Sequence, residues 1–391
     1  MNVHNAHTIA DLRRGAERRL PRAVFDYIDG GADGEVTMRE NCAVFDRVRF
    51  RPRNAAAMGA TDLRTTVLGT TLELPFLLAP VGSSRLFFPR GECVAAAEAG
   101  KAGTAYVLST LSGCRLEEVK AASSGPVWFQ LYLLGGREAA LASIARARAA
   151  GFGALVVTID TAVAGQRERD LRNGGRELIS GNLWKMLPHV GQVAARPRWT
   201  LDFLRDGGLM KFPNVVIGDQ GALPYEDVGA ALERSTVTWE DMPWIARAWG
   251  GPIVIKGVLS EQDARLAVEA GAAAIVVSNH GGRQLDCVAA TLQALPEVVR
   301  AVDRHAEVYL DGGIRRGSDV VKALCLGARA VLVGRAYAYG LGAAGGPGVA
   351  RAIEILRSGI VRTMRLLSCH EARALNDSYL DRSFPAQLKD E

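Results

Sequence analysis

Eight short apolar runs recur along most of this chain, and each is followed by a stretch with helical periodicity. The apolar runs cover residues 76–80, 105–109, 127–132, 154–159, 252–256, 273–278, 306–310 and 330–334. The helical stretches cover residues 91–102, 115–122, 137–150, 239–249, 260–270, 289–304, 317–326 and 346–366. Because short apolar runs are typical of strands buried on both faces, this alternation predicts a parallel sheet covered by helices.

Two α/β architectures are compatible with the alternation: an open doubly wound sheet and a closed (β/α)8 barrel. Eight strand–helix units are the number that closes a TIM barrel. A dinucleotide-binding open sheet carries G-x-G-x-x-G after its first strand, and no such sequence follows residues 76–80. The sequence therefore favours an α/β fold of the (β/α)8 TIM barrel type.

The chain is expected to form one domain over residues 1–391, with the barrel over residues 76–371. Residues 1–75 precede the repeat and form an N-terminal helical preface. Within this preface, residues 8–28 and 33–46 have the periodicity of amphipathic helices.

One connection is far longer than the others. Residues 161–238 separate the fourth apolar run from the next helical stretch, which exceeds ordinary loop lengths. This insertion mixes large apolar side chains, such as Trp199 and Phe203, with basic ones, such as Arg198. Such a mixture fits a lid, a subunit contact, a peripheral membrane patch, or a segment that packs on its own barrel.

Charge and hydropathy exclude several classes of protein. The 47 basic and 42 acidic residues give a net charge of +5 that is spread along the chain, so no nucleic-acid partner is expected. The N-terminal residues lack the apolar core of a signal peptide. No apolar run reaches the length of about 18 residues that spans a membrane. A cytoplasmic location is therefore expected.

The six cysteines are scattered, and no two form a C-x-x-C pair. In a cytoplasmic protein, this pattern predicts reduced thiols rather than disulfides or a zinc site. No metal is expected.

Polar residues gather where the predicted strands end. His280 and Arg283 follow the sixth run, with two glycines between them. Histidine takes up a proton near neutral pH, and arginine can bind a carboxylate through two parallel hydrogen bonds. Other strand ends supply Ser109, Gln130, Tyr132, Thr158, Asp160, Lys256, Ser278 and Asp311. Because the C-terminal strand ends form the active-site face of a TIM barrel, we expect a catalytic site there.

A ligand with a phosphate group is expected after the seventh and eighth runs. Gly313 and Gly334 precede helical stretches, where backbone N–H groups bind anions, and Arg315 and Arg335 add positive charge. Lys256, at the end of the fifth run, is costly to bury without a negative partner. It indicates a bound anion, a developing negative charge or a Schiff base.

Several segments resemble the family of FMN-dependent 2-hydroxy-acid dehydrogenases and oxidases. These are SNHGGRQLD at 278–286, WFQLY at 128–132, VTIDT at 157–161, IVIKGV at 253–258, DGGIRRGSDVVKALCLGA at 311–328 and FDYIDGGADGEVTMREN at 25–41. The resemblance extends from about residue 8 to residue 375. The segments GQRERDLRN at 165–173, RPRWTLDF at 196–203 and SNHGGRQLDC at 278–287 are most similar to the bacterial (S)-mandelate dehydrogenase branch.

The resemblance implies a role for each site residue. His280 is the expected base, Asp160 the carboxylate that orients it, and Tyr132 a hydrogen-bonding partner of the substrate. Arg283 and Arg167 are expected to hold the substrate carboxylate, with help from Tyr27, while Leu111 lines the substrate pocket. The expected FMN contacts are Val81, Gly82, Ser109, Gln130, Thr158, Lys256 and Ser278 for the ring and ribityl chain, and Asp311, Gly313, Arg315, Gly334 and Arg335 for the ribityl phosphate.

The implied activity is oxidation of an (S)-2-hydroxy acid, similar to mandelate, with FMN as cofactor. Gly82 stands where oxidases of the family have alanine, which favours a quinone or another non-oxygen acceptor. Leu111 stands where glycolate oxidases have a bulky aromatic residue, which favours a larger substrate. L-Lactate dehydrogenase activity and an oxygen-using oxidase are the alternatives. The family further suggests a homotetramer, and the 161–238 insertion suggests peripheral contact with the cytoplasmic face of the inner membrane.

Overall fold

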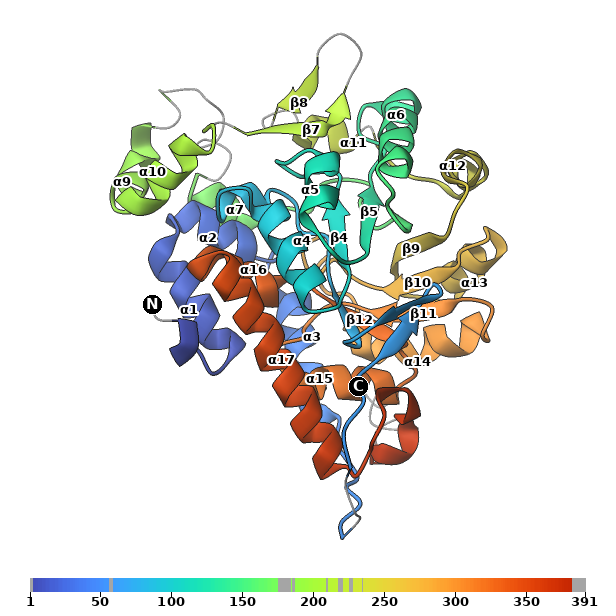
Figure 1. Ribbon diagram of the computed structural model, residues 1–391. Helices are drawn as coiled ribbons and strands as arrows, with labels where there is room; N and C mark the ends of the chain where they lie inside the picture. Colours follow the sequence, from blue (N-terminus) through green and yellow to red (C-terminus); the bar gives the residue numbers. More distant parts are fainter. Residues whose placement is uncertain are drawn as a thin grey trace.

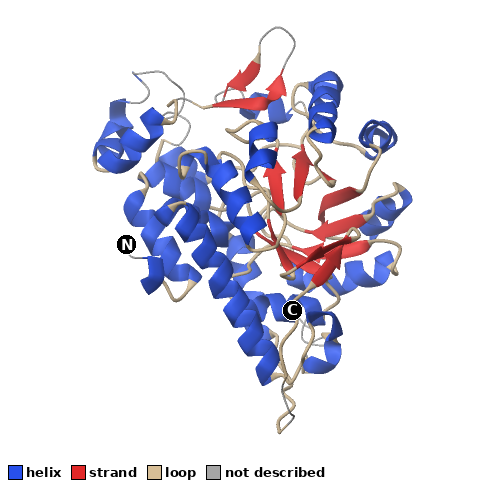
Figure 2. Cartoon of the chain, in the orientation of Figure 1, coloured by secondary structure: helices blue, strands red, loops and turns tan. Residues whose placement is uncertain are grey.

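The computed structural model describes residues 3–55, 59–174, 184, 187–208, 210–216, 221–224, 228–233 and 235–381. Parts of the 161–238 insertion, and both ends of the expected domain, lie outside the described residues. The described chain is organised around a closed barrel with helices packed on its outside (Figures 1 and 2).

Eight parallel strands close the barrel in the order β10-β11-β12-β3-β4-β5-β6-β9. Each falls within or beside an apolar run predicted from the sequence. Their bounds are β3 Phe76–Leu78, β4 Tyr106–Ser109, β5 Val127–Leu131, β6 Leu155–Thr158, β9 Ile253–Val258, β10 Ala274–Val277, β11 Glu307–Leu310 and β12 Ala330–Val333. The long insertion does not interrupt the ladder, since Leu155 of β6 pairs with Ile253 of β9. The predicted TIM barrel is confirmed.

The helices that follow the strands also agree with the sequence, with one exception. The expected ones are α4 Gly91–Lys101, α5 Leu116–Ala122, α6 Gly136–Ala149, α12 Met242–Trp249, α13 Glu261–Glu269, α14 Thr291–Val302, α15 Gly317–Cys325 and α17 Gly346–Leu366. The exception lies after β12, where the sequence placed only the helix at 346–366.

A further helix, α16 Arg335–Ala344, follows β12 directly. The sequence did not predict this helix because it contains glycines, and glycine in a helix interior ordinarily weakens the helix. Here they permit close packing: a Cβ on Gly340 would collide with the backbone oxygen of Gly348 in α17. A Cβ on Gly342 would lie 2.9 Å from Cδ1 of Leu20 in α1 (Ile9–Arg19).

The barrel interior is a separate apolar cluster. Its members include Val107, Trp128, Val254 and Tyr309, all fully or almost fully buried. The hairpin formed by β1 Thr65–Val67 and β2 Thr70–Leu72 contributes Val67 and Leu72 to the same cluster. A larger cluster fills the space between the strands and the helices.

The preface contains α1, α2 Arg22–Asp29 and α3 Val36–Arg47. The stretch predicted over residues 8–28 is divided into α1 and α2 at Pro21, which precedes the first residue of α2. The preface is anchored to the loop that follows β10. The side chains of Asn41 and Asn279 exchange two hydrogen bonds of 2.8 and 3.0 Å. The preface therefore forms one side of the barrel mouth.

The described part of the insertion contains α7 Glu168–Arg172, α9 Val190–Ala194, α10 Pro197–Arg205, the antiparallel pair β7 Lys211–Val216 and β8 Ala222–Pro224, and α11 Val228–Glu233. Helices α9 and α10 form one corner of the molecule (Figure 1). Helix α10 is docked on the barrel, because Trp199 Nε1 donates a 2.8 Å hydrogen bond to the carbonyl of Leu86.

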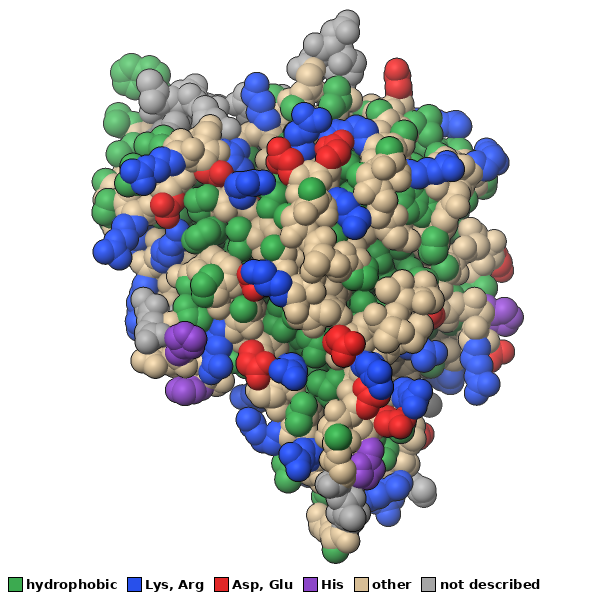
Figure 3. All heavy atoms as spheres, in the orientation of Figure 1, with side chains coloured by type: hydrophobic (Ala, Val, Ile, Leu, Met, Phe, Trp, Pro, Cys, Tyr) green, Lys and Arg blue, Asp and Glu red, His purple; other side chains and the backbone are tan. Residues whose placement is uncertain are grey.

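Within the described residues, no helix combines the length and the apolar character needed to cross a membrane. On the face seen in Figure 3, basic and acidic side chains are interspersed rather than segregated.

Candidate active site

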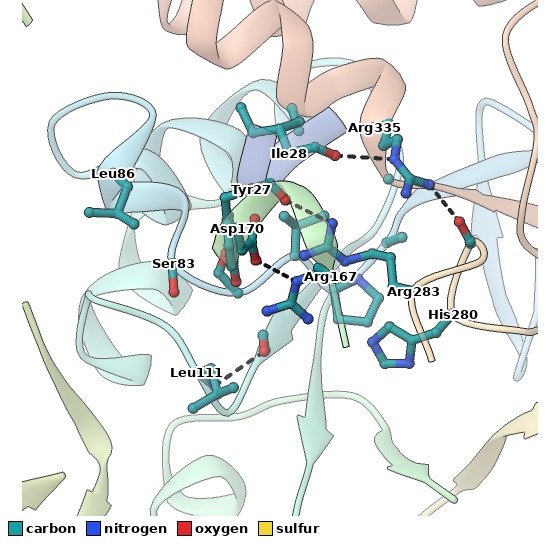
Figure 4. Close-up of a pocket in the computed structure, with 18 of the residues that line it drawn as sticks. Tyr27, Ile28, Ser83, Leu86, Leu111, Arg167, Asp170, His280, Arg283 and Arg335 are labelled. Atoms are coloured by element: carbon teal, nitrogen blue, oxygen red, sulfur yellow. Dashed lines mark hydrogen bonds and ion pairs between the residues drawn. The ribbon is translucent and has the colours of Figure 1, made fainter. Parts of the chain in front are cut away.

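A cavity of about 810 Å³ opens at the C-terminal ends of the barrel strands. Its walls come from the strand-end loops, from α2 and from α10; Figure 4 shows Leu111 and Ser83 facing Arg283 and His280 across it. The predicted site residues that line it are Tyr27, Val81, Gly82, Ser109, Leu111, Tyr132, Arg167, Lys256, His280, Arg283, Asp311, Gly313, Arg315, Gly334 and Arg335. Asp160, Gln130, Thr158 and Ser278 lie behind this lining.

His280 is held in one orientation by Asp160. Its Nδ1 lies 3.0 Å from Asp160 Oδ1, and its Nε2 lies 3.4 Å from the hydroxyl of Tyr132. The backbone of His280 has a positive φ of 58°, a left-handed conformation in which histidine is more common than most non-glycine residues. This turn directs the ring from the end of β10 toward the cavity.

The two neighbours of His280 are fixed in opposite protonation states. Burial alone would raise the pKa of Asp160, but the electrostatic interactions with His280 and Lys256 and the hydrogen bond with His280 outweigh it and lower the pKa below its ordinary value. Burial and the Asp160 charge raise the pKa of Tyr132. Near neutral pH, Asp160 is therefore a carboxylate and Tyr132 a neutral hydrogen-bond donor.

Two guanidinium groups lie beside the ring of Tyr27, as Figure 4 shows. Arg283 Cζ is 5.1 Å and Arg167 Cζ 5.7 Å from the ring centroid. Arg283 donates to the carbonyls of Tyr27 and Gly30, and Arg167 Nε donates to Asp170 Oδ2 at 2.6 Å. Burial, with the charges of Arg167 and Arg335, lowers the pKa of Arg283 to about 10. An anion in the cavity would relieve this crowding of positive charge.

Lys256 has a partner within the chain. Its Nζ lies 3.1 Å from Asp311 Oδ2 and donates a 2.8 Å hydrogen bond to Ser278 Oγ. Burial would lower the pKa of Lys256, but the carboxylates of Asp311 and Asp160 more than offset it and raise the pKa. The amine is therefore an ammonium ion, which is not the nucleophile that a Schiff base requires.

Ser109, Gln130 and Thr158 form a buried chain of hydrogen bonds. Ser109 Oγ donates to Gln130 Oε1 at 3.2 Å, and Gln130 Nε2 donates to Thr158 Oγ1 at 3.0 Å. Only Ser109 lines the cavity. The hydrogen bonds of Gln130 and Thr158 thus support the cavity floor.

Gly82, which lines the cavity, packs tightly against Leu111 and Tyr27. A Cβ at this position would lie 3.2 Å from Cβ of Leu111 and 3.5 Å from the hydroxyl of Tyr27. An alanine would therefore fit only if Leu111 shifted by a few tenths of an ångström. With glycine at position 82, this part of the cavity surface carries no side chain.

The guanidinium of Arg335 is occupied by backbone. It donates to the carbonyls of Ile28, Gly30 and Gly281 at 3.1, 2.8 and 2.7 Å. This side chain joins α2 to the loop after β10. The N-terminus of α16, which begins at Arg335, lines the same end of the cavity and offers backbone N–H groups.

Sequence reasoning missed three parts of the site. Asp170, which binds Arg167, lies in the insertion, where no element was predicted. The Asn41–Asn279 pair was missed although Asn279 stands inside the SNHGG segment. Trp199 and Phe203 of α10, whose rings stack with centroids 5.0 Å apart, also line the cavity. Their pairing depends on how the insertion folds back, which no local pattern encodes.

The sequence model described as FMN-dependent dehydrogenase matches residues 16–382. The chain belongs to the FMN-dependent dehydrogenase family. L-Lactate dehydrogenase from Caulobacter vibrioides (strain NA1000 / CB15N) is 41% identical over 378 residues, covering 96% of this chain and 97% of that protein. (S)-Mandelate dehydrogenase from Pseudomonas putida is 37% identical over 379 residues, covering 96% of this chain and 94% of that protein.

A solved structure described as the monotopic membrane protein (S)-mandelate dehydrogenase superposes with a TM-score of 0.89 at 37% identity. The match covers 96% of this chain and 99% of that chain. The two sequence relatives differ in the substrate they are named for, and their identities to this chain are close. Similarity therefore establishes the family and its cofactor, FMN, without separating the two substrates.

The residues of the cavity fit FMN. Asp311, which lines the cavity, has a buried Oδ1 without a hydrogen-bond partner within the described chain. A buried acceptor of this kind requires a donor, and ribityl hydroxyl groups are donors. Lys256 provides a fixed positive charge, and the N-terminus of α16 provides N–H groups for a phosphate.

Proposed function

We propose that this chain oxidises an (S)-2-hydroxy acid to the 2-oxo acid. The observation that carries the proposal is the Asp160–His280 pair, which faces the guanidinium groups of Arg283 and Arg167 in one cavity. A base beside a carboxylate-binding group is what abstraction of a proton from a hydroxy acid requires. When bound, FMN supplies the acceptor for the two electrons that leave the substrate.

Each cavity residue has a proposed task. Arg283 and Arg167 bind the substrate carboxylate, and Tyr27, stacked beside them, adds its hydroxyl. Because Asp160 accepts the hydrogen on His280 Nδ1, the lone pair of Nε2 is available to remove a proton from the substrate. Tyr132 donates a hydrogen bond to the substrate oxygen on which negative charge develops.

Other residues are proposed to hold the cofactor. Val81, Gly82 and Ser109 are placed to face the flavin ring, while Gln130, Thr158 and Ser278 support that surface from behind. Lys256 would stabilise negative charge on the ring, and Asp311 would accept ribityl hydroxyl hydrogens. The backbone of Gly313 and Gly334, with Arg315 and the backbone N–H of Arg335, would enclose the phosphate, while the Arg335 guanidinium stays on its backbone carbonyls.

We propose a mandelate-like substrate, because Leu111 leaves the pocket wall free of a bulky aromatic ring. L-Lactate is the second candidate, supported by the Caulobacter vibrioides relative. The test is anaerobic addition of each acid to the purified yellow protein. Rapid bleaching of the flavin by (S)-mandelate but not L-lactate supports the first. Bleaching by L-lactate alone supports the second, and bleaching by neither contradicts the proposed function.

The acceptor that reoxidises the enzyme is proposed to be a quinone or another non-oxygen acceptor, since Gly82 resembles the dehydrogenases of the family. Slow return of the yellow colour in air, and fast return with a soluble quinone, are the expected results. Fast return in air alone would assign the chain as an oxidase.

We propose that the α9–α10 corner contacts the membrane peripherally. Val190, Leu201 and Leu204 are 44%, 48% and 64% exposed there, and the basic side chains of Arg198 and Arg205 are exposed beside them. Apolar side chains flanked by basic ones suit an anionic lipid surface. In Figure 3 this corner shows hydrophobic and basic side chains together.

Vesicle flotation tests the membrane proposal. The Leu201→Gln/Leu204→Gln variant should lose binding to anionic vesicles, whereas Leu366→Gln, at an exposed leucine of α17 that is 68% exposed, should retain it. Equal flotation of all three proteins would contradict the proposal.

A homotetramer, proposed from family resemblance, predicts a light-scattering mass of four chains.

A further inference from the structure

Three metal-ligating side chains meet outside the cavity, between α4 and α5. The thiols of Cys93 and Cys114 and a carboxylate oxygen of Glu118 all lie within 4.8 Å of one another. Cys93 belongs to the first turn of α4, Cys114 precedes α5, and Glu118 lies in α5. The two helices pack side by side (Figure 1), which brings together cysteines that are far apart in the sequence.

A further acidic side chain, Glu92, lies beside Cys114 at the edge of this cluster. Glu92 is fully buried, and its Oε1 accepts a 3.0 Å hydrogen bond from the backbone N–H of Gly113. Its Oε2 is buried without a hydrogen-bond partner in the described chain, and its carboxyl group contacts the Cys114 thiol. A buried carboxyl oxygen without a partner is costly, and a cation beside it would remove this cost.

We propose that Cys93, Cys114 and Glu118 bind a thiophilic divalent cation of the zinc type, with a water molecule in the fourth position. Two thiolates and one carboxylate are sulfur and oxygen donors of the kinds that Zn²⁺ accepts in its fourfold coordination. Arg90, whose Nη2 lies 3.9 Å from Cys93 Sγ, offsets part of the surplus negative charge. Cys93 and Cys114 are both buried, while Glu118 is exposed and provides access from solvent.

The site would stabilise one wall of the cavity. Cys114 lies in the loop between β4 and α5, which also carries the cavity residue Leu111, and Asn214 of β7 donates a 3.0 Å hydrogen bond to the carbonyl of Cys114 in the same loop. A metal would tie this loop to the start of α4. The sequence predicted reduced thiols and no metal because it contains no C-x-x-C pair; helix packing, rather than spacing, creates the cluster.

The test is equilibrium dialysis of the tag-free, FMN-loaded protein against Zn²⁺ after treatment with a chelator, with metal and protein quantified. One zinc per chain is expected, together with a higher thermal midpoint than the metal-free protein, because a ligand that binds the folded state stabilises it. Cys93→Ser and Cys114→Ser should abolish stoichiometric binding. Glu118→Gln, at an exposed position that folding tolerates, should weaken binding by at least about tenfold.

Glu117→Gln is the matched control. It makes the same chemical change one residue away, where Glu117 pairs with Arg146 at 2.9 Å instead of facing the cysteines. It should leave zinc binding unchanged, as should Cys287→Ser, which removes an exposed thiol elsewhere. Wild-type protein without stoichiometric zinc, zinc that survives both cysteine substitutions, or a Cys93–Cys114 disulfide formed in the presence of zinc would overturn the proposal.

Discussion

His280 Nδ1 lies 3.0 Å from Asp160 Oδ1, although 120 residues separate the two positions. The pair joins the loop after β6 to the loop after β10 across β9. Because the carboxylate accepts the hydrogen on Nδ1, Nε2 faces Tyr132 and the cavity as an acceptor. The orientation of the proposed base therefore depends on barrel closure rather than on any local sequence.

Replacing Leu111 by tryptophan should narrow the substrate pocket. We expect kcat/KM for (S)-mandelate to fall by at least about tenfold relative to that for L-lactate, since the added ring fills the space of the phenyl group. Leu111→Met, which conserves volume, should leave kcat/KM for both acids nearly unchanged. Steady-state kinetics with both acids measures this. An equal fall for the two acids would mean that Leu111 acts on the loop and not on substrate size.

Replacing Lys256 by methionine should leave the buried Asp311 carboxylate without its partner. Breaking a buried ion pair in this way costs about 3–5 kcal/mol of unfolding free energy. The variant should also retain less FMN after gel filtration, because the fixed positive charge is gone. Lys256→Met/Asp311→Asn removes both charges and should recover stability but not the flavin. Wild-type stability and flavin content in the single variant would contradict this role.

Asp29 at the end of α2 is expected to stabilise the folded state in a pH-dependent way. Burial would raise its pKa, but hydrogen bonds from Arg13, Tyr339 and Arg169 outweigh it and lower the pKa to about 2. A lowered pKa in the folded state stabilises the fold above the unfolded pKa of 3.8, and this contribution is lost as the pH falls toward about 2. The shift corresponds to about 2 kcal/mol at neutral pH.

Denaturant unfolding of Asp29→Asn tests this contribution. The loss of stability relative to wild type should be largest at neutral pH and should shrink below about pH 4. Glu354→Gln, which removes an exposed pair with Arg357, should cost at most about 1 kcal/mol. A deficit for Asp29→Asn that grows on acidification would have the wrong sign.

The barrel could be predicted because its strands are buried on both faces, so that each appears as an apolar run in the sequence. Val276 and Val254, for example, are both fully buried. Helix α16 could not be predicted in the same way. Its interior glycines at 340 and 342 indicate the end of a helix when only the local sequence is considered. Their role is to permit the close contacts of α16 with α17 and α1, which depend on the tertiary fold. The insertion was also beyond prediction, since its helices pack on the barrel mouth rather than repeat its pattern.

The candidate site was largely predictable for one physical reason: parallel strands deliver their C-terminal residues to one end of the barrel. This rule brought His280, Lys256 and Asp311 together without any knowledge of side-chain contacts. It did not show that Lys256 pairs with Asp311, or that the Arg335 guanidinium donates its hydrogen bonds to backbone carbonyls. Such partners depend on side-chain directions that only the folded chain sets.

The most direct test of the central claim is anaerobic single-turnover reduction of the flavin in His280→Asn. Asparagine tolerates the positive φ at this position, so the loop should fold and the yellow cofactor should remain bound. We expect flavin reduction by the preferred acid to slow by at least about 10²–10⁴-fold, the usual contribution of a positioned base. Reduction at a rate within a few-fold of wild type, with flavin fully bound, would contradict the assignment of His280 as the base.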